Sequence, residues 1–196
     1  MQIDTDHLHF WMMAIRQSTD PLRTMDAFWS GQIQSKEWLI EKLTKYVHKS
    51  STIEIHGGWV GVLASLIFQS KIPVRYISSI DIDPECEPIA TMMNKIEEQN
   101  GRFRALTNDM TDVQITGDIV INTSTEHISQ EQYDFWLSKV PDNSLIVIQS
   151  NNYKIPEHIR PMDTLEQFKC SCNLNILESG VLRCQLYDRF MIIGTK

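Results

Sequence analysis

Hydrophobic residues recur along the chain with two different spacings. Over residues 7–17 and 35–48 they recur at helical spacing and predict two helices, with an irregular segment between them. From residue 51 onward, short β-rich runs alternate with helical runs, as expected of a parallel sheet covered by helices. The predicted strands span residues 52–56, 75–80, 103–106, 118–122 and 144–149. The predicted helices that follow them span residues 60–69, 85–98, 130–138 and 162–168.

The C-terminal part of the chain ends on strand-like runs. Residues 174–177 and 189–193 predict two further strands, with Ser179-Gly180 as a turn signal between them. No repeat, low-complexity tract or linker divides the chain, so we expect residues 1–196 to form a single α/β domain. Within it, residues 1–50 are expected to form a helical N-terminal cap and residues 51–196 the core.

The composition is that of an ordinary globular protein, with 42% hydrophobic and 22% charged residues. The chain has no apolar run of membrane-spanning length, and its first residues lack the pattern of a signal peptide. We therefore expect a cytoplasmic protein with no membrane partner. The net charge of −7 disfavours a broad grip on nucleic acid, because neutralisation of phosphates normally dominates that affinity. A small molecule or a peptide is the expected substrate.

The four cysteines have neither a CxxC pair nor the spacing of a disulfide framework, which predicts reduced thiols. A zinc site built from Cys170, Cys172 and a histidine is disfavoured for the same reason. We therefore expect no metal.

A glycine pair follows the first predicted strand. In TIEIHGGWVGVLASLIF, the strand runs through Gly57 and Gly58 into an apolar helix. Without Cβ atoms these residues let the backbone approach a ligand, and the next helix offers unpaired N–H groups at its N-terminus. A tight turn without a ligand would have the same pattern.

An acidic residue ends the second predicted strand. Asp81, in YISSIDIDP, follows Gly58 by about twenty residues, the spacing of a carboxylate that accepts ribose hydroxyls. Asp83 offers the same chemistry shortly after it. Together with the glycine turn, this pattern favours ligand binding over an ordinary exposed loop.

These motifs resemble those of the class I S-adenosylmethionine-dependent methyltransferases over about residues 51–196. Residues 54–58 look like that family's first motif, residues 80–84 like its ribose-binding strand end, and residues 108–110 like its acidic site beside adenine. The resemblance implies a Rossmann-like methyltransferase fold: a mostly parallel seven-stranded sheet with a C-terminal antiparallel hairpin and helices on both faces. It also implies S-adenosylmethionine (SAM) as cofactor and an enzyme that methylates a small-molecule or peptidic nucleophile.

By that resemblance, one group of residues would bind the cofactor. Asp81 would bind ribose, Asp109 the adenine amino group, and Glu54 the methionine end or the loop. His56 stands where the family usually has glycine, and would either orient a ligand or bond to backbone. Gly61 would stand in for a displaced glycine. The expected cofactor-binding residues are Glu54, His56, Gly57, Gly58, Asp81, Asp83, Asp109 and Met110.

The loop after the fourth predicted strand should border the transfer site, because ligands gather beyond the carboxyl ends of the strands in open α/β sheets. Glu126 or His127 would remove a proton from the acceptor, and Asn122 would hold an amine or hydroxyl group. The alternative is that Ser124 or Thr125 caps the next helix, with Glu126 supporting the cap.

Further polar residues are expected to face the same cleft. After the fifth strand, Asn151, Asn152 and Tyr153 would contact a polar substrate, with His158 following them, unless the asparagines only form turns. In the N-terminal cap, Trp29 would line the cleft or act as a hydrophobic staple for the helix after it.

Two other functions fit the same motifs. HGGWVGVLA followed by SSIDIDP also resembles nicotianamine synthase, in which the aminocarboxypropyl arm of SAM is transferred instead of the methyl group. The other possible function is that of a catalytically inactive, methyltransferase-like binding protein, which the replacement of a family glycine by His56 would permit. INTSTEH, QSNNY and RFMIIG resemble small methyltransferase-like proteins of bacteriophages. Methylation of DNA bases is disfavoured, because Asn122 is followed by Thr-Ser-Thr instead of two prolines and an aromatic residue.

Overall fold

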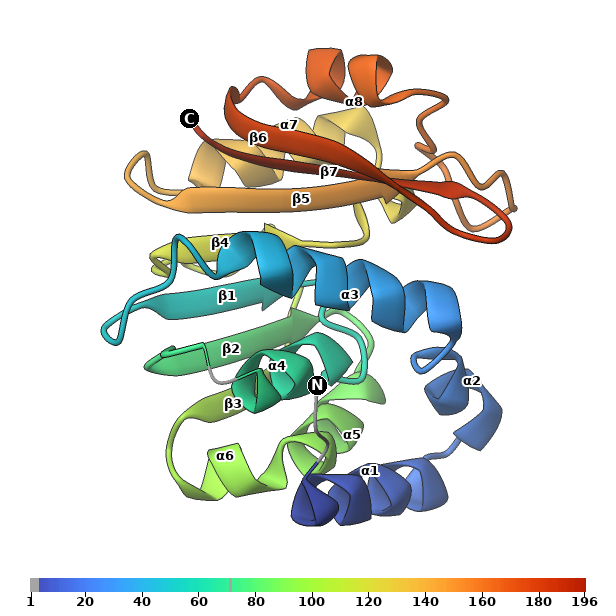
Figure 1. Cartoon of the computed structure of the whole chain (residues 1–196), viewed down its shortest axis with the longest axis vertical. Coiled ribbons are helices and arrows are strands. Elements are labelled where there is room, and N and C mark those ends of the chain that lie inside the picture. The colour runs from blue at the N-terminus through green and yellow to red at the C-terminus, as the bar shows by residue number, and fades with distance from the viewer. Residues whose placement is uncertain (1–3, 71) are drawn as a thin grey trace.

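The centre of the fold is a seven-stranded sheet, formed within residues 4–70 and 72–196, the parts of the chain that the computed structural model describes (Figure 1). Its strands are β1 (Thr52–His56), β2 (Tyr76–Asp81), β3 (Phe103–Thr107), β4 (Ile119–Asn122), β5 (Leu145–Asn151), β6 (Asn175–Arg183) and β7 (Asp188–Thr195). The helices are α1 (Thr5–Gln17), α2 (Pro21–Asp26), α3 (Ser30–Leu43), α4 (Val62–Gln69), α5 (Cys86–Met93), α6 (Lys95–Gln99), the 3-10 helix η1 (Thr125–His127), α7 (Gln130–Lys139) and α8 (Leu165–Cys172).

The strands lie in the order β3-β2-β1-β4-β5-β7-β6. β1 to β5 are parallel to one another, whereas β7 lies antiparallel between β5 and β6. The predicted Rossmann-like sheet with a C-terminal antiparallel hairpin is therefore confirmed. Because the chain moves from β1 out to β3 and then returns to β4, the strand order reverses beside β1. Ligands bind at such a switch point, beyond the carboxyl ends of the strands.

Helices cover both faces of the sheet, and each face has its own hydrophobic core. On one face, Ile53 and Ile55 of β1 belong to the same core as Leu39 of α3. On the other, Ile146 of β5 belongs to a core with Trp136 of α7. Figure 1 shows α3 and α4 in front of the strands and α7 behind them. Because both faces are covered, the central strands β1, β4 and β5 are buried along almost their whole length, including polar residues such as Glu54 and Gln149.

The N-terminal helices, for which the sequence predicts a cap, are spread around the sheet and do not all lie on one edge. In Figure 1 they run from α1, beside α5, through α2 at the edge to α3 across the front. The segment expected to be irregular contains α2, which begins at Pro21 with Asp20 as its N-cap. α3 begins at Ser30, earlier than predicted. Gly31 interrupts the apolar pattern there because the Tyr187 hydroxyl would lie 2.9 Å from a Cβ at this position.

The predicted turn at Ser179-Gly180 is wrong. β6 runs straight through both residues, and Gly180 pairs with Met191 of β7. A glycine is present because Trp38 of α3 packs on the strand, 3.0 Å from where a Cβ would lie. The turn of the hairpin lies further on, where Cys184 N–H donates to the Tyr187 carbonyl at 2.9 Å.

The helices expected over residues 85–98 and 162–168 also have different bounds in the structure. The helix expected over residues 85–98 is divided at Asn94, whose side-chain amide donates to the carbonyls of Gly61 and Ala90 at 3.0 Å each. The helix expected over residues 162–168 begins later, after the N-cap Thr164. Among the described residues, no helix combines the length and the apolar character needed to cross a membrane. All four cysteines are free thiols.

The turn into α4 provides a test of this packing. Gly61 has a φ of 77°, and a Cβ there would lie 2.7 Å from Asn94 Nδ2 and 2.9 Å from Ala90 Cβ. Gly101 has a φ of 69°, but a Cβ there would meet no described atom within 4 Å. Gly101→Ala should lower the free energy of unfolding by about 1–2 kcal/mol, the cost of left-handed backbone. Gly61→Ala should cost roughly 1–3 kcal/mol more through overpacking. Urea denaturation of both variants measures the difference, and equal losses would contradict this account.

Candidate functional site

A cavity of about 730 Å³ lies at the carboxyl edge of the sheet, beside the switch point. Its walls are the turn after β1, the tip of β2, the loops after β3 and β4, part of the segment after β5, and residues of α2, α3 and β7. The volume is within the range of cavities that hold small-molecule ligands and cofactors. Segments far apart in the sequence therefore meet at one site.

The glycine turn passes very close to its neighbours. Gly57 has a φ of 64°, and a Cβ there would overlap the Ser124 hydroxyl of the loop after β4. A Cβ on Gly58 would overlap the Ser79 hydroxyl of β2. The Gly58 N–H donates to the Ile80 carbonyl at 3.0 Å, which holds the turn against β2. Only glycine at both positions lets the backbone lie this close to the sheet edge while also lining the cavity.

Asp81 lines the cavity at the tip of β2 and binds the glycine turn directly. Its Oδ2 accepts the Trp59 N–H at 2.7 Å, and its Oδ1 accepts the Asp83 N–H at 3.1 Å. Trp59 holds this position with a φ of 48°, in the left-handed region that residues other than glycine seldom adopt. Each carboxylate oxygen accepts more than one hydrogen bond, so both can still bind ligand hydroxyls. Ile82, next to Asp81, lines the cavity with 68% of its surface exposed.

Asp109 and Met110 line the cavity from the loop after β3. Asp109 Oδ1 accepts the Thr111 N–H at 2.8 Å and the Thr111 hydroxyl at 2.7 Å. These hydrogen bonds lower the pKa of Asp109, so it is a carboxylate at neutral pH. Met110 Sδ lies 3.5 Å from Asn122 Nδ2, which joins this loop to the end of β4.

All three residues predicted to be catalytic, Asn122, Glu126 and His127, line the cavity. Asn122 Oδ1 accepts the Ser124 N–H at 3.0 Å, so its amide is partly used in shaping its own loop. The expectation that Ser124 or Thr125 caps the next helix is wrong. Ser129 is the N-cap of α7 and forms a capping box with Gln132. Residues 125–127 form η1 instead and are free of the capping role.

Glu126 is held in a buried ion pair. Its Oε1 lies 2.6 Å from Arg189 Nη1 and accepts from Asn151 Nδ2 at 2.5 Å, while Arg189 Nη2 donates to the Thr123 carbonyl at 2.8 Å. The two side chains are 3% and 5% exposed. A buried charge is tolerated only when it is paired in this way, so Glu126 and Arg189 depend on each other.

Lys36 of α3 places a buried amine in the same part of the cavity. Its Nζ donates to Gln32 Oε1 at 2.8 Å. Burial and, to a lesser extent, the charge of Arg189 lower the pKa of Lys36, Glu126 opposes both effects, and the resulting pKa is about 7. The amine therefore exchanges its proton near neutral pH.

Three of the residues expected to bind cofactor are not among the described residues that line the cavity: Glu54, His56 and Asp83. Glu54 Oε1 accepts the Thr116 N–H and hydroxyl at 2.9 Å each. His56 is fully buried, with its ring 5.8 Å from that of Trp136 on α7. Asp83 pairs with Arg23 of α2 at 2.6 Å, which fastens the cap to the tip of β2. Each of these side chains has a structural partner, and the partner of Asp83, Arg23, itself lines the cavity.

The residues expected to contact substrate also lie outside the described cavity lining. Asn151 holds Glu126 and accepts the Tyr153 N–H at 2.8 Å, and Asn152 accepts the Asp188 N–H at 2.8 Å. Tyr153 packs near Tyr187, with ring centroids 5.6 Å apart. Trp29 is the N-cap of α3 and is 62% exposed. The two asparagines therefore position other groups.

The cavity residues that sequence reasoning missed include Arg23, Lys36, Ile82 and Arg189. Only Ile82 had a local signal, because it directly follows Asp81. Arg189 and Lys36 come from opposite ends of the chain, and each looks like an ordinary surface charge in the sequence.

No family model matches the chain, and no curated protein sequence matches it. Solved structures do match it in fold. The magnesium protoporphyrin IX methyltransferase ChlM from Synechocystis PCC 6803, with bound SAM, aligns with a TM-score of 0.68 and 12% identity over 98% of this chain and 92% of that chain. The N-methyltransferase NodS from Bradyrhizobium japonicum WM9, in complex with S-adenosyl-L-homocysteine (SAH), aligns with a TM-score of 0.68 and 11% identity over 95% of this chain and 98% of that chain.

A third similar structure is that of a point mutant of MtNAS, a nicotianamine synthase, in complex with S-adenosylmethionine. It aligns with a TM-score of 0.59 and 12% identity over 97% of this chain and 72% of that chain. At such low identities the three structures establish a shared fold, and the reaction has to be argued from the site. They do not bear on the resemblance to bacteriophage proteins. The chain therefore has the Rossmann-like fold of these SAM-binding proteins.

The buried Lys36 predicts how stability depends on pH. An unfolded lysine is protonated below about pH 10.4, whereas the folded Lys36 is neutral above about pH 7. Between these values the unfolded state binds a proton that the native state does not, so stability falls as the pH is lowered toward 7 and the loss is constant below that. Lys36→Met should thus have a higher free energy of unfolding than the wild type. The gain should be smallest near pH 10.5 and largest at pH 7 and below, where it reaches at most about 5 kcal/mol. Urea denaturation across this range measures the gain. Lys49→Met, at an exposed lysine, is the control, and a pH-independent gain for Lys36→Met would contradict the prediction.

Proposed function

We propose that this protein is an enzyme that binds SAM and transfers its methyl group to a small-molecule or peptidic acceptor. The observation that supports this most strongly is the convergence of the glycine turn, Asp81 and Asp109 on one cavity at the switch point of the sheet. The shared fold with structures that contain SAM or SAH agrees with it. The net charge of −7 and the size of the cavity favour a small acceptor over nucleic acid.

The groups in one half of the cavity fit the nucleoside of SAM. Asp81 offers two carboxylate oxygens for the ribose hydroxyls, and Asp109 offers an acceptor for the adenine amino group. Ile82 and Met110 supply apolar surface for the faces of the adenine ring. Exposure of Ile82 to water is unfavourable, and stacking of an adenine against it would relieve this cost.

The groups in the other half fit the acceptor. SAM supplies an electrophilic methyl group on a positively charged sulfur. The protein has to hold the nucleophile in line with that methyl group and exclude water, and proximity of this kind accounts for much of the rate in such reactions. Arg189 would attract an acceptor that carries a negative charge, and the Lys36 amine would donate a hydrogen bond to it, because both line this half of the cavity.

The three catalytic candidates have different roles in this proposal. His127 Nδ1 lies 3.1 Å from the Glu157 carbonyl, so this nitrogen donates and Nε2 is the atom that can take a proton from the acceptor. Glu126 Oε1 is already bound by Arg189 and Asn151, so this side chain positions its surroundings instead. Asn122 would hold the acceptor through the part of its amide that its own loop does not use.

Transfer of the aminocarboxypropyl arm of SAM is the second candidate. The similarity to MtNAS supports it, since this chain and that nicotianamine synthase share their fold over 97% of this chain. The two reactions leave different products from SAM. Methyl transfer leaves SAH, whereas aminocarboxypropyl transfer leaves methylthioadenosine.

The cofactor assignment is tested by calorimetric titration with SAM and with SAH. The wild type should bind both, and Asp81→Ala should weaken binding by about 100-fold or more, because two hydrogen bonds to a charged group are lost. Asp81→Asn retains an acceptor for the Trp59 N–H, so the glycine turn keeps its hydrogen bond. This variant therefore separates the effect of lost ribose contacts from the effect of a displaced turn. Asp142→Asn, at a carboxylate whose side chain is 90% exposed, is the matched control. Unchanged affinity in Asp81→Ala would reject the assignment, and a wild type that binds neither ligand would support a binding protein without catalysis.

The reaction is tested by mass spectrometry of SAM incubated with the protein and pools of small carboxylates, amines and peptides. We expect SAH to accumulate together with an acceptor that is 14 mass units heavier, the mass of one added CH₂ group. Accumulation of methylthioadenosine would favour the second candidate instead. His127→Gln should reduce turnover by roughly 10²-fold or more if a base is required, without changing SAH affinity.

A further inference from the structure

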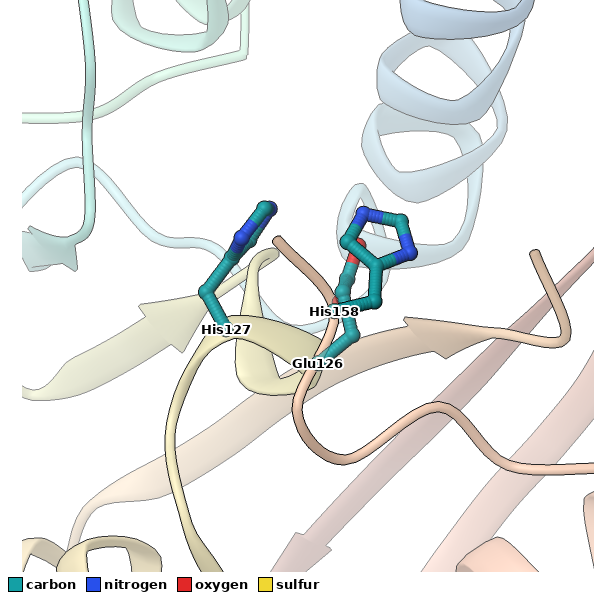
Figure 2. A group of neighbouring side chains, drawn as sticks. All are labelled: Glu126, His127 and His158. Atoms are coloured by element: carbon teal, nitrogen blue, oxygen red, sulfur yellow. The ribbon is translucent and has the colours of Figure 1, made fainter. Parts of the chain in front are cut away.

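A carboxylate and two imidazoles meet on the wall of the cavity. Glu126 and His127 belong to η1, after β4, and His158 lies in the segment after β5 (Figure 2). Each of the three side chains offers one ligand atom, and these atoms all lie within 4.8 Å of one another. The loops that follow two adjacent parallel strands therefore bring together three groups that bind metal ions.

Both imidazoles are held in the same way. His127 Nδ1 lies 3.1 Å from the Glu157 carbonyl, and His158 Nδ1 lies 2.6 Å from the Tyr153 carbonyl. A carbonyl oxygen only accepts hydrogen bonds, so each Nδ1 carries the proton and each Nε2 has a free lone pair. A metal-bound histidine normally donates its other ring nitrogen to a carbonyl or carboxylate in this manner.

Glu126 has one oxygen that is buried without a partner. Arg189 and Asn151 both bind Oε1, whereas Oε2 makes no hydrogen bond with any residue that the structure describes. The residue is only 3% exposed, and a buried carboxylate oxygen without a partner is costly. A cation bound to Oε2 would remove that cost. Arg189 does not fill this role, because it is bound to Oε1.

The loops that present the three groups are firmly connected. The Arg160 N–H donates to the Glu126 carbonyl at 2.9 Å, and Arg160 Nη1 donates to Gln130 Oε1 at 2.6 Å. The Arg160 guanidinium also lies 4.6 Å from the centroid of the Tyr133 ring. The Thr125 hydroxyl donates to the Gln149 carbonyl of β5 at 2.7 Å. These contacts join η1 to the segment after β5, so the three groups are held near one another before any ligand binds.

We infer that His127 Nε2, His158 Nε2 and Glu126 Oε2 form a binding site for a divalent first-row transition metal ion such as Zn²⁺. Two imidazoles and one carboxylate are a donor set of catalytic Zn²⁺ and Fe²⁺ sites, whereas Mg²⁺ and Ca²⁺ prefer oxygen ligands alone. All three residues line the cavity, so the remaining coordination positions face the space assigned to the acceptor. With the metal bound, His127 Nε2 is a ligand and does not act as the base. The metal would instead bind an acceptor with an oxygen or nitrogen donor and lower the pKa of that donor.

The proposed metal site does not require bound SAM, because all three of its ligand atoms belong to the protein. Two positive side chains, Arg189 and Lys36, lie in the same half of the cavity and would oppose a cation. Arg189 is already matched by Glu126 Oε1, and burial of Lys36 favours its neutral amine. Only an acceptor role for the metal rests on the proposed transfer reaction.

The experiment uses Co²⁺ as a spectroscopic probe. The full-length protein is treated with a chelator, freed of it, and titrated with Co²⁺ while the visible d–d absorption is recorded, and Zn²⁺ is then added as a competitor. We expect one Co²⁺ per chain, bands typical of nitrogen and oxygen ligands, and displacement by Zn²⁺. His127→Gln and His158→Gln should each weaken Co²⁺ binding at least tenfold. His9→Gln, at an exposed histidine of α1, should leave the affinity unchanged.

Each outcome decides the inference. Absence of Co²⁺ binding by the wild type, or equal affinities in the wild type and both loop variants, would overturn it. Circular dichroism of each variant confirms folding, and SAH calorimetry on His158→Gln separates this site from the cofactor site. If SAH binds normally while Co²⁺ binding is absent from the wild type, the metal site fails and the proposed function stands. If Co²⁺ binds as expected and SAH does not bind, the metal site stands and the proposed function fails.

Discussion

The turn at the end of β1 has no room for side chains at Gly57 or Gly58, and the site depends on this constraint. The turn lies against Ser79 of β2 on one side and against the loop after β4 on the other. Asp81 then holds the turn from the tip of β2 through the Trp59 N–H. The same carboxylate that is proposed to bind ribose thus also fixes the loop beneath the cofactor. Binding and local structure are coupled at Asp81, which is why the conservative Asp81→Asn variant is informative.

The buried pair of Glu126 and Arg189 organises the opposite half of the cavity. Its two members come from the loop after β4 and from β7, which are distant in the sequence but adjacent once the hairpin is added to the sheet. Because each charge is buried, neither is stable without the other. The pair orients Glu126 so that one oxygen is occupied and the other is available. The groups proposed to bind metal and acceptor are therefore positioned by a contact that also stabilises the fold.

The shared fold explains what this chain has in common with ChlM, NodS and MtNAS, and it does not identify the acceptor. The first half of the sheet presents the glycine turn and the two aspartates that fit a nucleoside. The loops after β4 and β5 present His127, His158 and Glu126 to the part of the cavity proposed for the acceptor. The reaction depends on these side chains of the loops after β4 and β5, so substitutions in these loops identify it more directly than the shared fold does.

The amino-acid sequence determined the alternation of strands and helices, the glycine turn, the placement of Asp81 and Asp109 after their strands, and the C-terminal hairpin, because local spacing and parallel pairing bring strand ends to one edge. The three-dimensional structure decided which side chains face the cavity. Glu54 and His56 lie two positions apart on β1 and therefore share one face of the sheet. Glu54 binds Thr116 and His56 packs near Trp136, so neither side chain reaches the cavity. Arg189 and Lys36 belong to the cavity only because β7 and α3 pack beside the loops. Such contacts depend on the packing of distant segments, which no local pattern of residues records.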